Sequence, residues 1–267
     1  MFQFHVIALG SGGVAACVRC ERTPDVAYPA GQVLARIAAL PAEVGSVAGS
    51  AGATGTQQGA AEHGAGSAVA DVAQKAGVTS DPAAGVALGG FEPFSHPALP
   101  ELIAAVVERG VRRLLLQTDG GALIFGDNAR GVVDAGVRIF EFGYRAGNEV
   151  LHDELCGRPG LAAERAQGIH QLRELEAVNP DLHLTLIGVA RLCRHNTGEL
   201  YGIAEAALRE GLDGLRIEIE PGAQVDAVQL RAARELLLPA GVLLFGDGCE
   251  QLLGGARPYE LLDDQVM

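Results

Sequence analysis

Short apolar runs alternate along this chain with stretches in which apolar residues recur every three or four positions. Runs of the first kind are typical of buried strands, and stretches of the second kind are typical of amphipathic helices. The apolar runs predict strands at Phe4–Leu9, Gly85–Gly89, Arg113–Thr118, Arg138–Tyr144, His183–Val189, Leu215–Glu220 and Gly241–Gly246. The periodic stretches predict helices at Gln32–Leu40, Pro100–Arg109, Gly160–Leu175, Glu199–Glu210 and Val225–Leu238.

This order of elements predicts an α/β fold. Strands that alternate with helices through short connections form parallel sheets with right-handed crossovers. Gly110 and Gly211 follow helical stretches, where a glycine closes a helix at little energetic cost. We therefore predict a partial (β/α)6 TIM-like barrel of parallel strands plus a terminal strand, which makes residues 1–267 a single domain.

A segment between the first predicted helix and the second predicted strand breaks this pattern. Residues 41–82 form an insertion whose middle, Gly45–Gly66, is rich in Gly, Ala, Ser and Thr and has no apolar period. Such a composition predicts a flexible loop. A loop of this length inside a compact domain is usually either functional or disordered, so both a lid and plain disorder stay open.

Charge and cysteine usage narrow the class of protein. The chain carries a formal net charge of −13, which repels nucleic acids and anionic membranes. Its N-terminus lacks the basic region of a signal peptide, and no apolar run reaches membrane-spanning length. Its five cysteines are odd in number and scattered, which argues for a reducing compartment. We expect a cytoplasmic protein with no nucleic-acid or membrane partner.

Three segments carry candidate chemistry, and each lies at or after a predicted strand. The first is Gly13–Cys20 (GVAACVRC), the second is Gly89–Pro93 (GGFEP), and the third begins at Leu115–Gly120 (LLQTDG) and continues to His152-Asp153. Taken together, their order and spacing resemble the radical S-adenosylmethionine (radical SAM) superfamily. The resemblance covers roughly residues 4–22 and 84–220.

The resemblance implies a cofactor site and a metal site. In that family a CxxxCxxC motif holds a 4Fe–4S cluster, and Cys17 and Cys20 match its second and third positions. The family's GGEP segment binds the amino group of S-adenosylmethionine through its backbone. The residues implied in cofactor binding are therefore Gly89, Gly90, Phe91, Glu92, Pro93, Gln117 and Thr118.

The first position of the cluster motif departs from the family, because Gly13 stands where a cysteine is expected. Thiolates are the natural ligands of iron–sulfur clusters, and glycine has no side chain to replace one. Cys156, Cys193, Cys249 and Ser11 are the candidates for a replacement ligand. Without a reducible cluster the radical chemistry cannot proceed, because it belongs to the cofactor.

Three functions remain open from the sequence. The first is a degenerate radical-SAM-like protein that acts as an accessory subunit and binds a peptide substrate or a catalytic partner protein. The second is an active radical SAM enzyme with an atypically ligated cluster. The third is an unrelated barrel enzyme that uses carboxylates at strand ends, such as Glu141, Glu218 and Glu220.

Two further groups of residues have both a catalytic and a structural interpretation. Glu218 and Glu220 share one face of their strand, so that they either line the barrel with Glu141 and Arg191 or lie at a solvated edge. His152 and Asp153 are either an acid–base pair or a loop-capping device.

Overall fold

A computed structural model describes residues 4–11, 26–40 and 85–246 of the chain. Seven parallel strands form one open sheet in the order β1-β4-β5-β6-β7-β8-β9. They are β1 (Phe4–Ala8), β4 (Gly85–Gly89), β5 (Leu114–Thr118), β6 (Ile139–Tyr144), β7 (Thr185–Leu192), β8 (Gly214–Ile219) and β9 (Leu243–Gly246). A small antiparallel pair, β2 (Gly10–Ser11) and β3 (Val26–Ala27), follows the first strand.

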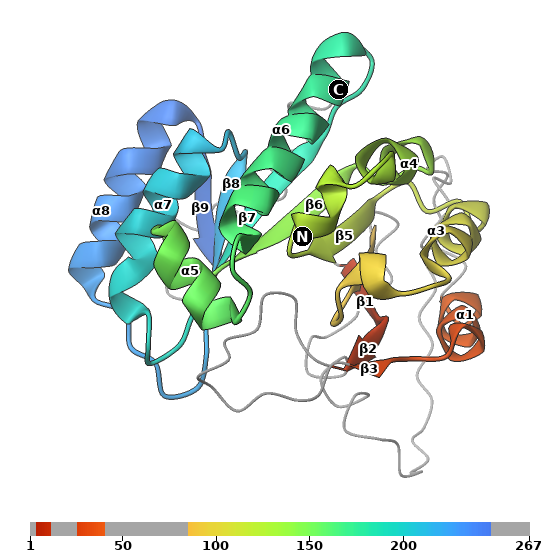
Figure 1. Cartoon of the computed structure of the whole chain (residues 1–267), viewed down its shortest axis with the longest axis horizontal. Helices are drawn as coiled ribbons and strands as arrows, with labels where there is room; N and C mark the ends of the chain where they lie inside the picture. Colours follow the sequence, from red (N-terminus) through yellow and green to blue (C-terminus); the bar gives the residue numbers. More distant parts are fainter. Residues whose placement is uncertain (1–3, 12–25, 41–84, 247–267) are drawn as a thin grey trace, which may run out of the picture.

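Helices connect successive strands and pack against one face of the sheet (Figure 1). The α-helices are α1 (Ala30–Ala38), α3 (Leu99–Glu108), α4 (Asn128–Asp134), α5 (Glu149–Cys156), α6 (Leu161–Val178), α7 (Leu200–Arg209) and α8 (Ala227–Leu237). Single turns of 3-10 helix are η2 (Pro93–Ser95), η3 (Gly121–Ile124), η4 (Thr197–Glu199) and η5 (Leu238–Ala240).

The main core lies between this face of the sheet and the helices. Alternate residues of β6, namely Phe140, Phe142 and Tyr144, are fully buried there. The helices contribute their periodic apolar positions, such as Leu102 and Ile103 of α3. This burial of apolar area is the main source of stability for such a layer.

The structure confirms the predicted fold class and most element positions. The seven predicted strands are all present, in sequential order and parallel, as an open sheet compatible with a partial barrel. Gly110 and Gly211 take left-handed backbone conformations after α3 and α7, with φ of 78° and 73°. No bounds were predicted for α4 and α5, which have only 7 and 8 residues and so offer about two turns of periodicity to detect.

Two expectations concern the extent of the chain. The insertion at residues 41–82 lies outside the described residues. Whether it forms a lid is therefore not tested. Within the described ranges, no helix is both long enough and apolar enough to span a bilayer. The single-domain prediction stays a prediction.

Candidate functional site

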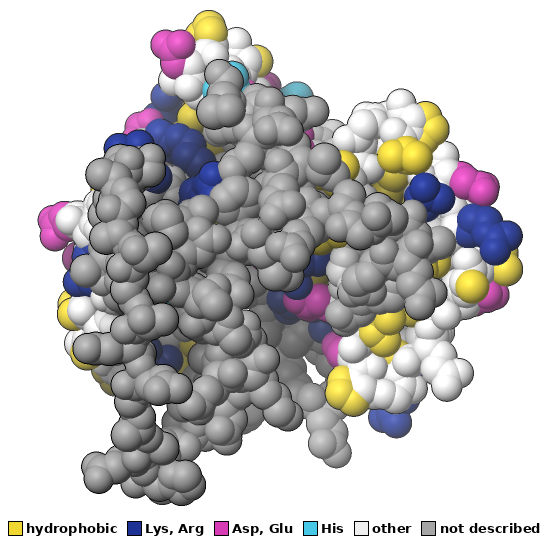
Figure 2. Space-filling model, turned by 180° about the vertical axis from the view of Figure 1, so that it is seen from behind, with side chains coloured by type: hydrophobic (Ala, Val, Ile, Leu, Met, Phe, Trp, Pro, Cys, Tyr) yellow, Lys and Arg dark blue, Asp and Glu magenta, His cyan; other side chains and the backbone are white. Residues whose placement is uncertain are grey.

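The face of the sheet opposite to the helices, which we call the inner face, changes in polarity along the strands. Near the amino ends it carries apolar residues such as Ala87, Leu115 and Ile187. Towards the carboxyl ends it carries charged and amide side chains. When the molecule is seen from behind, acidic and basic side chains are visible next to one another near the middle of the view (Figure 2). The polar part lies at the strand ends where parallel α/β folds place their ligands.

A chain of hydrogen bonds links four strands on the inner face, and we call it the inner-face ladder. It consists of Gln117 on β5, Glu141 on β6, Arg191 on β7, and Arg216 and Glu218 on β8. Gln117 Nε2 donates to Glu141 Oε2 at 2.8 Å. Arg216 donates from Nε and from Nη2 to the two oxygens of Glu141, at 2.9 Å each. The two-pronged geometry makes this the strongest link of the ladder.

Glu218 closes the ladder at its exposed end. Its two oxygens accept hydrogen bonds from Arg216 Nη1 and from Arg191 Nε, the latter at 2.9 Å. Burial acts to raise the pKa of Glu218, but the Arg191 and Arg216 guanidinium groups outweigh it and hold the pKa below its usual value. Glu218 is therefore held in its charged form at neutral pH.

A second group of bonds fastens the carboxyl ends of β6, β7 and β8 to one another. Arg145 is 3% exposed and donates from Nη1 to Glu220 Oε1 at 2.7 Å and to the carbonyl of Arg191 at 3.1 Å. The buried Asn196 donates from Nδ2 to the carbonyls of Arg145 and Arg191 at 2.6 and 3.0 Å. Glu141, Glu218 and Glu220 thus lie on the barrel side of the sheet, each paired with an arginine.

The GGFEP segment lies at the end of β4, where its glutamate joins β4 to β5. Glu92 accepts hydrogen bonds from Thr118 Oγ1 at 2.8 Å, from the Asp119 amide at 2.7 Å and from the Phe94 amide at 3.3 Å. Burial, and secondarily the charge of Asp119, raise the pKa of Glu92 to about 8. Phe91 and Pro93 are buried beside it. The carboxyl group therefore caps a turn and holds two strand ends together.

Gly89 and Gln117 meet where the GGFEP segment touches the ladder. A Cβ atom on Gly89 would lie 2.0 Å from Gln117 Oε1, so only glycine leaves room for this amide. The Gly89 carbonyl accepts from the Leu9 amide at 2.8 Å. Gly90 has a φ of 72°, which favours glycine. The residues implied in cofactor binding thus gather on β4 and β5, and their role toward a cofactor stays a prediction.

The cysteines divide into two groups. Cys17, Cys20 and Cys249 lie outside the described residues. Cys156 and Cys193 are buried, with Cys156 at the end of α5 and Cys193 packed against Leu155 of the same helix. Burial raises the pKa of the Cys156 thiol to about 12, which disfavours the thiolate that ligation needs.

The described residues do not by themselves provide an iron–sulfur site. Among them, no cluster of three or more His, Cys, Asp or Glu side chains could hold a metal ion. Fit to a 4Fe–4S cluster therefore depends on Cys17 and Cys20 and on an additional ligand.

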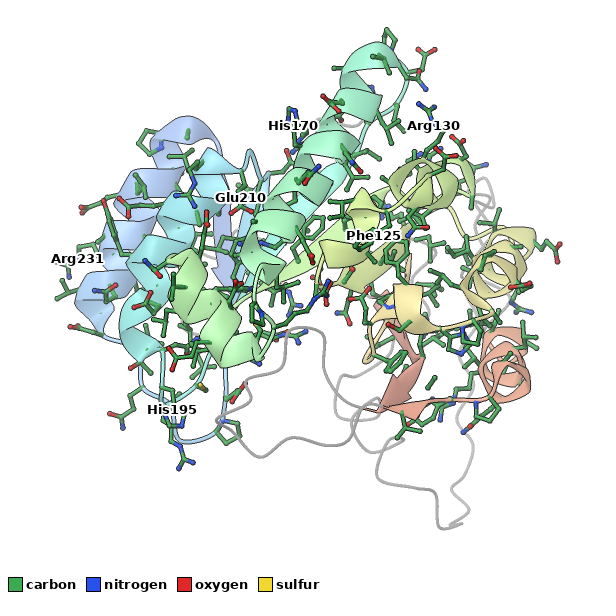
Figure 3. The ribbon with its side chains drawn as sticks, in the orientation of Figure 1. Phe125, Arg130, His170, His195, Glu210 and Arg231 are labelled. Atoms are coloured by element: carbon green, nitrogen blue, oxygen red, sulfur yellow. The ribbon has the colours of Figure 1, made fainter. Side chains whose placement is uncertain are left out.

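Sequence reasoning missed a buried polar cluster on the helix side of β6, which we call the helix-side cluster. Its centre is Arg165 of α6, which donates to both oxygens of Glu210 at 3.2 and 3.3 Å. The guanidinium carbon lies 3.8 Å from the ring centre of Tyr144, whose hydroxyl donates to Glu210 at 2.6 Å. Glu210, labelled in Figure 3, directly follows α7. An arginine on an otherwise amphipathic helix gives no signal in the sequence that it is buried.

His152 belongs to the helix-side cluster, and Asp153 caps the next helix. His152 Nδ1 accepts from the Arg145 amide at 3.1 Å, and its Nε2 lies 3.5 Å from Cys156 Sγ. Burial and the charges of Arg165 and Arg145 lower the pKa of His152 to about 3. Asp153 accepts from the amides of Gly160 and Ala162 at the start of α6. Of the two interpretations of this pair, the structure supports the capping one for Asp153.

Sequence reasoning did not name Arg216 of the ladder or Arg145 of the second group of bonds. Arg216 has the same parity on β8 as Glu218 and Glu220, so the alternation of the strand could have identified it. Arg145 follows β6 directly, but its partners on β7 and β8 depend on strand neighbours that no local pattern reveals.

Comparison with known proteins identifies relatives only by structure. No family model matches the chain, and a search of curated proteins finds no match either. Among solved structures, SuiB from Streptococcus suis has a TM-score of 0.56 and 13% sequence identity, over 93% of this chain and 50% of SuiB. SuiB bound to the precursor peptide SuiA has a TM-score of 0.55 and 12% identity, over 95% of this chain and 51% of SuiB.

A third structure, SuiB bound to S-adenosylmethionine, has a TM-score of 0.52 and 13% identity, over 93% of this chain and 48% of SuiB. This chain thus spans about half the length of SuiB. At such identity the comparison establishes the fold and not the activity. The chain has a fold like that of the radical SAM enzymes, which confirms the resemblance inferred from its motifs.

Proposed function

We propose that this chain is a radical-SAM-like protein with an incomplete iron–sulfur site, which acts as an accessory subunit and binds a peptide or a partner protein in the cytoplasm. The observation that carries the proposal is Gly13 in the place of the first cluster cysteine. The two described cysteines that could replace it are buried against α5, and Cys156 has a raised pKa.

The inner-face ladder supports a binding role without radical chemistry. Charged side chains that would face a cofactor inside a barrel are here joined to one another across four strands. A cofactor bound at the ladder would have to replace ion pairs that are already made, and that replacement is unfavourable. The peptide part of the proposal draws on SuiB, for which a complex with a precursor peptide is known.

An active radical SAM enzyme with an atypical cluster is the second candidate. It is favoured by the presence of both Cys17 and Cys20 and of the GGFEP segment. In that case S-adenosylmethionine would lie near Gly89, Gly90 and Glu92, and the cluster would take its third ligand from outside the described residues.

Anaerobic iron–sulfur reconstitution separates the two candidates. Iron and sulfide are counted per chain, and EPR spectra are taken after reduction with and without S-adenosylmethionine. The wild-type chain should hold substoichiometric iron and give no signal that responds to S-adenosylmethionine. Wild-type protein that holds about four irons and gives a responsive signal would establish the active enzyme instead.

The variant Gly13→Cys restores the family motif and sharpens this test. If the missing thiolate is the defect, the variant should gain a cluster of about four irons. The matched control is Gly12→Cys, which adds the same thiol one position away from the motif and should gain none. Equal iron in the two variants would argue against Gly13 as the decisive departure.

A further inference from the structure

Three exposed apolar side chains occupy the same position in three helices of the outer layer. Val150, Tyr201 and Val228 are each the second residue of their helix, in α5, α7 and α8. Their exposed fractions are 76%, 37% and 66%. Val150 and Val228 thus leave most of their apolar area in water, and exposed apolar residues that lie together often mark an interaction site.

Two contacts bring the starts of these helices together. Gly147, just before α5, packs so closely on Gly202 that a Cβ at Gly147 would lie 2.0 Å from the Gly202 backbone. The Tyr201 amide donates to Gln229 Oε1 of α8 at 3.1 Å. The helices α5, α7 and α8 also lie side by side in Figure 1. The starts of the three helices, which carry Val150, Tyr201 and Val228, therefore lie on neighbouring parts of the surface.

This surface also borders the polar end of the inner face. The three helices begin within a few residues of the carboxyl ends of β6, β7 and β8. Those strand ends carry Arg191, Glu218 and Glu220. A polypeptide bound across the helix starts would thus lie next to the strand ends, where sites of this fold class are found.

Carboxylates surround the apolar residues. Glu149 and Asp226 are exposed at the starts of α5 and α8, and Glu199 directly precedes α7. Among the described residues, none of the three makes an ion pair. Asp226 also accepts a hydrogen bond from the Val228 amide as the N-cap of α8. The nearest cations in the sequence are Arg145, which pairs with Glu220, and the exposed Arg194 and Arg231. Arg194 donates to the exposed His195, and His195 and Arg231 are labelled in Figure 3.

We propose that this surface, made of Val150, Tyr201 and Val228 with Glu149, Glu199 and Asp226, binds a segment of a partner polypeptide that carries both basic and apolar side chains. We call it the helix-start surface. The proposal specifies the partner chemistry for the proposed binding role, and it rests on that role only for the expectation that the partner is a polypeptide.

Charge selects this occupant over the others. A second copy of the chain would bring two sets of unpaired carboxylates together, which is unfavourable for a protein of net charge −13. An anionic membrane or a nucleic acid would be repelled for the same reason. A basic and apolar segment would pair the carboxylates and cover Tyr201, and tyrosine is enriched among the residues that dominate interfaces.

Fluorescence anisotropy with the full-length chain tests the proposal. The probe is a short labelled peptide of leucine and lysine, and its counterpart has every lysine replaced by glutamate. The leucine–lysine peptide should bind and the leucine–glutamate peptide should not. The triple variant Val150→Ser/Tyr201→Ser/Val228→Ser and the charge variant Glu149→Gln/Glu199→Gln/Asp226→Asn should each weaken binding by about tenfold, a change of about 1.4 kcal/mol.

A matched control removes apolar side chains elsewhere. Val178→Ser/Leu238→Ser changes exposed residues at the C-terminal ends of α6 and α8 and should leave binding unchanged. Circular dichroism checks that every variant is folded. Wild-type affinity in both helix-start variants, or equal binding of the two peptides, would overturn the proposal. Iron content is measured separately, so failure here is distinct from failure of the proposed function.

Discussion

The inner-face ladder and the helix-side cluster both contain arginine–glutamate pairs, but they differ in exposure. In the ladder, Arg216 and Glu218 are 20% and 35% exposed, whereas Arg165 and Glu210 of the helix-side cluster are 2% and 6% exposed. Loss of one partner is most destabilising where water cannot solvate the charge that is left. The Arg165–Glu210 pair should therefore stabilise the protein more than the Arg216–Glu218 pair does, and the Arg216–Glu141 pair should lie between them because Glu141 is only 3% exposed.

The largest expected effect comes from breaking the helix-side pair. Arg165→Met leaves Glu210 buried without its main cation and should lower the free energy of unfolding by about 3–5 kcal/mol. Urea denaturation at pH 7 measures this. Arg209→Met is the matched control, since Arg209 approaches Glu210 only to 3.9 Å and is 60% exposed. If Arg165→Met lowers the free energy of unfolding by less than about 1 kcal/mol, burial does not make the helix-side pair more important than the ladder.

The equivalent substitution in the ladder should lower the free energy of unfolding by less. Arg216→Met removes the two-pronged pair with Glu141, but Glu141 keeps Gln117 and Glu218 keeps Arg191. We expect a loss of about 2 kcal/mol, because part of the ladder is solvated and the remaining partners are charged or polar. Denaturation under the same conditions as for Arg165→Met gives the comparison directly. An equal or larger loss would show that exposure does not decide the effect.

The helix-side cluster should also lose stability as the pH falls. The pKa of His152 is lowered from 6.5 to about 3, so below pH 6.5 the unfolded state takes up a proton that the folded state does not. The contribution of neutral His152 to the free energy of unfolding is fully present above pH 6.5. It declines by at most about 1.4 kcal/mol per pH unit as the pH falls to 3. In His152→Gln this pH dependence should disappear from urea titrations between pH 7 and pH 4.

Glu92, which joins the ends of β4 and β5, should have the opposite effect on the pH dependence of stability. Its pKa is raised from 4.5 to about 8, so the folded state keeps a proton that the unfolded state has released. The contribution is complete below pH 4.5 and is lost as the pH rises to about 8. The stability of wild type relative to Glu92→Gln should therefore fall between pH 5 and pH 8. A rising difference would contradict the burial of this carboxyl group.

The smallest expected effect is a capping interaction. Asp153→Ala removes the acceptor for the Gly160 and Ala162 amides and should destabilise the protein by about 1 kcal/mol. Asp127→Ala is the control, because Asp127 precedes α4 without a side-chain capping bond and should change stability by less than about 0.5 kcal/mol. Thermal denaturation of the two variants side by side measures the difference.

Local pattern was sufficient for most of the fold. The strand at Gly85–Gly89 has the predicted bounds, β5 and β6 differ from prediction by one residue at one end, and β8 differs by one residue at each end. Such runs are short, apolar and flanked by turn residues, so the prediction needs only nearby positions. The sequence also indicated that Gly89, Glu92, Gln117 and Thr118 lie near strand ends, because they belong to contiguous segments there, and their role toward a cofactor stays a prediction. Tertiary context was needed for Arg145, Arg165 and Arg216.

The amino-acid sequence by itself determined the alternation of parallel strands and helices, the likeness to the radical SAM fold and the absence of a cysteine at Gly13. Each depends on residue identity and on spacing along the chain. Only the tertiary structure decided that Glu92 braces two strands, that Arg216 bridges Glu141 and Glu218, and that Arg165 is buried against Tyr144. Those outcomes depend on which strands are neighbours and on how much water reaches each charge, and both are fixed only when distant segments pack together.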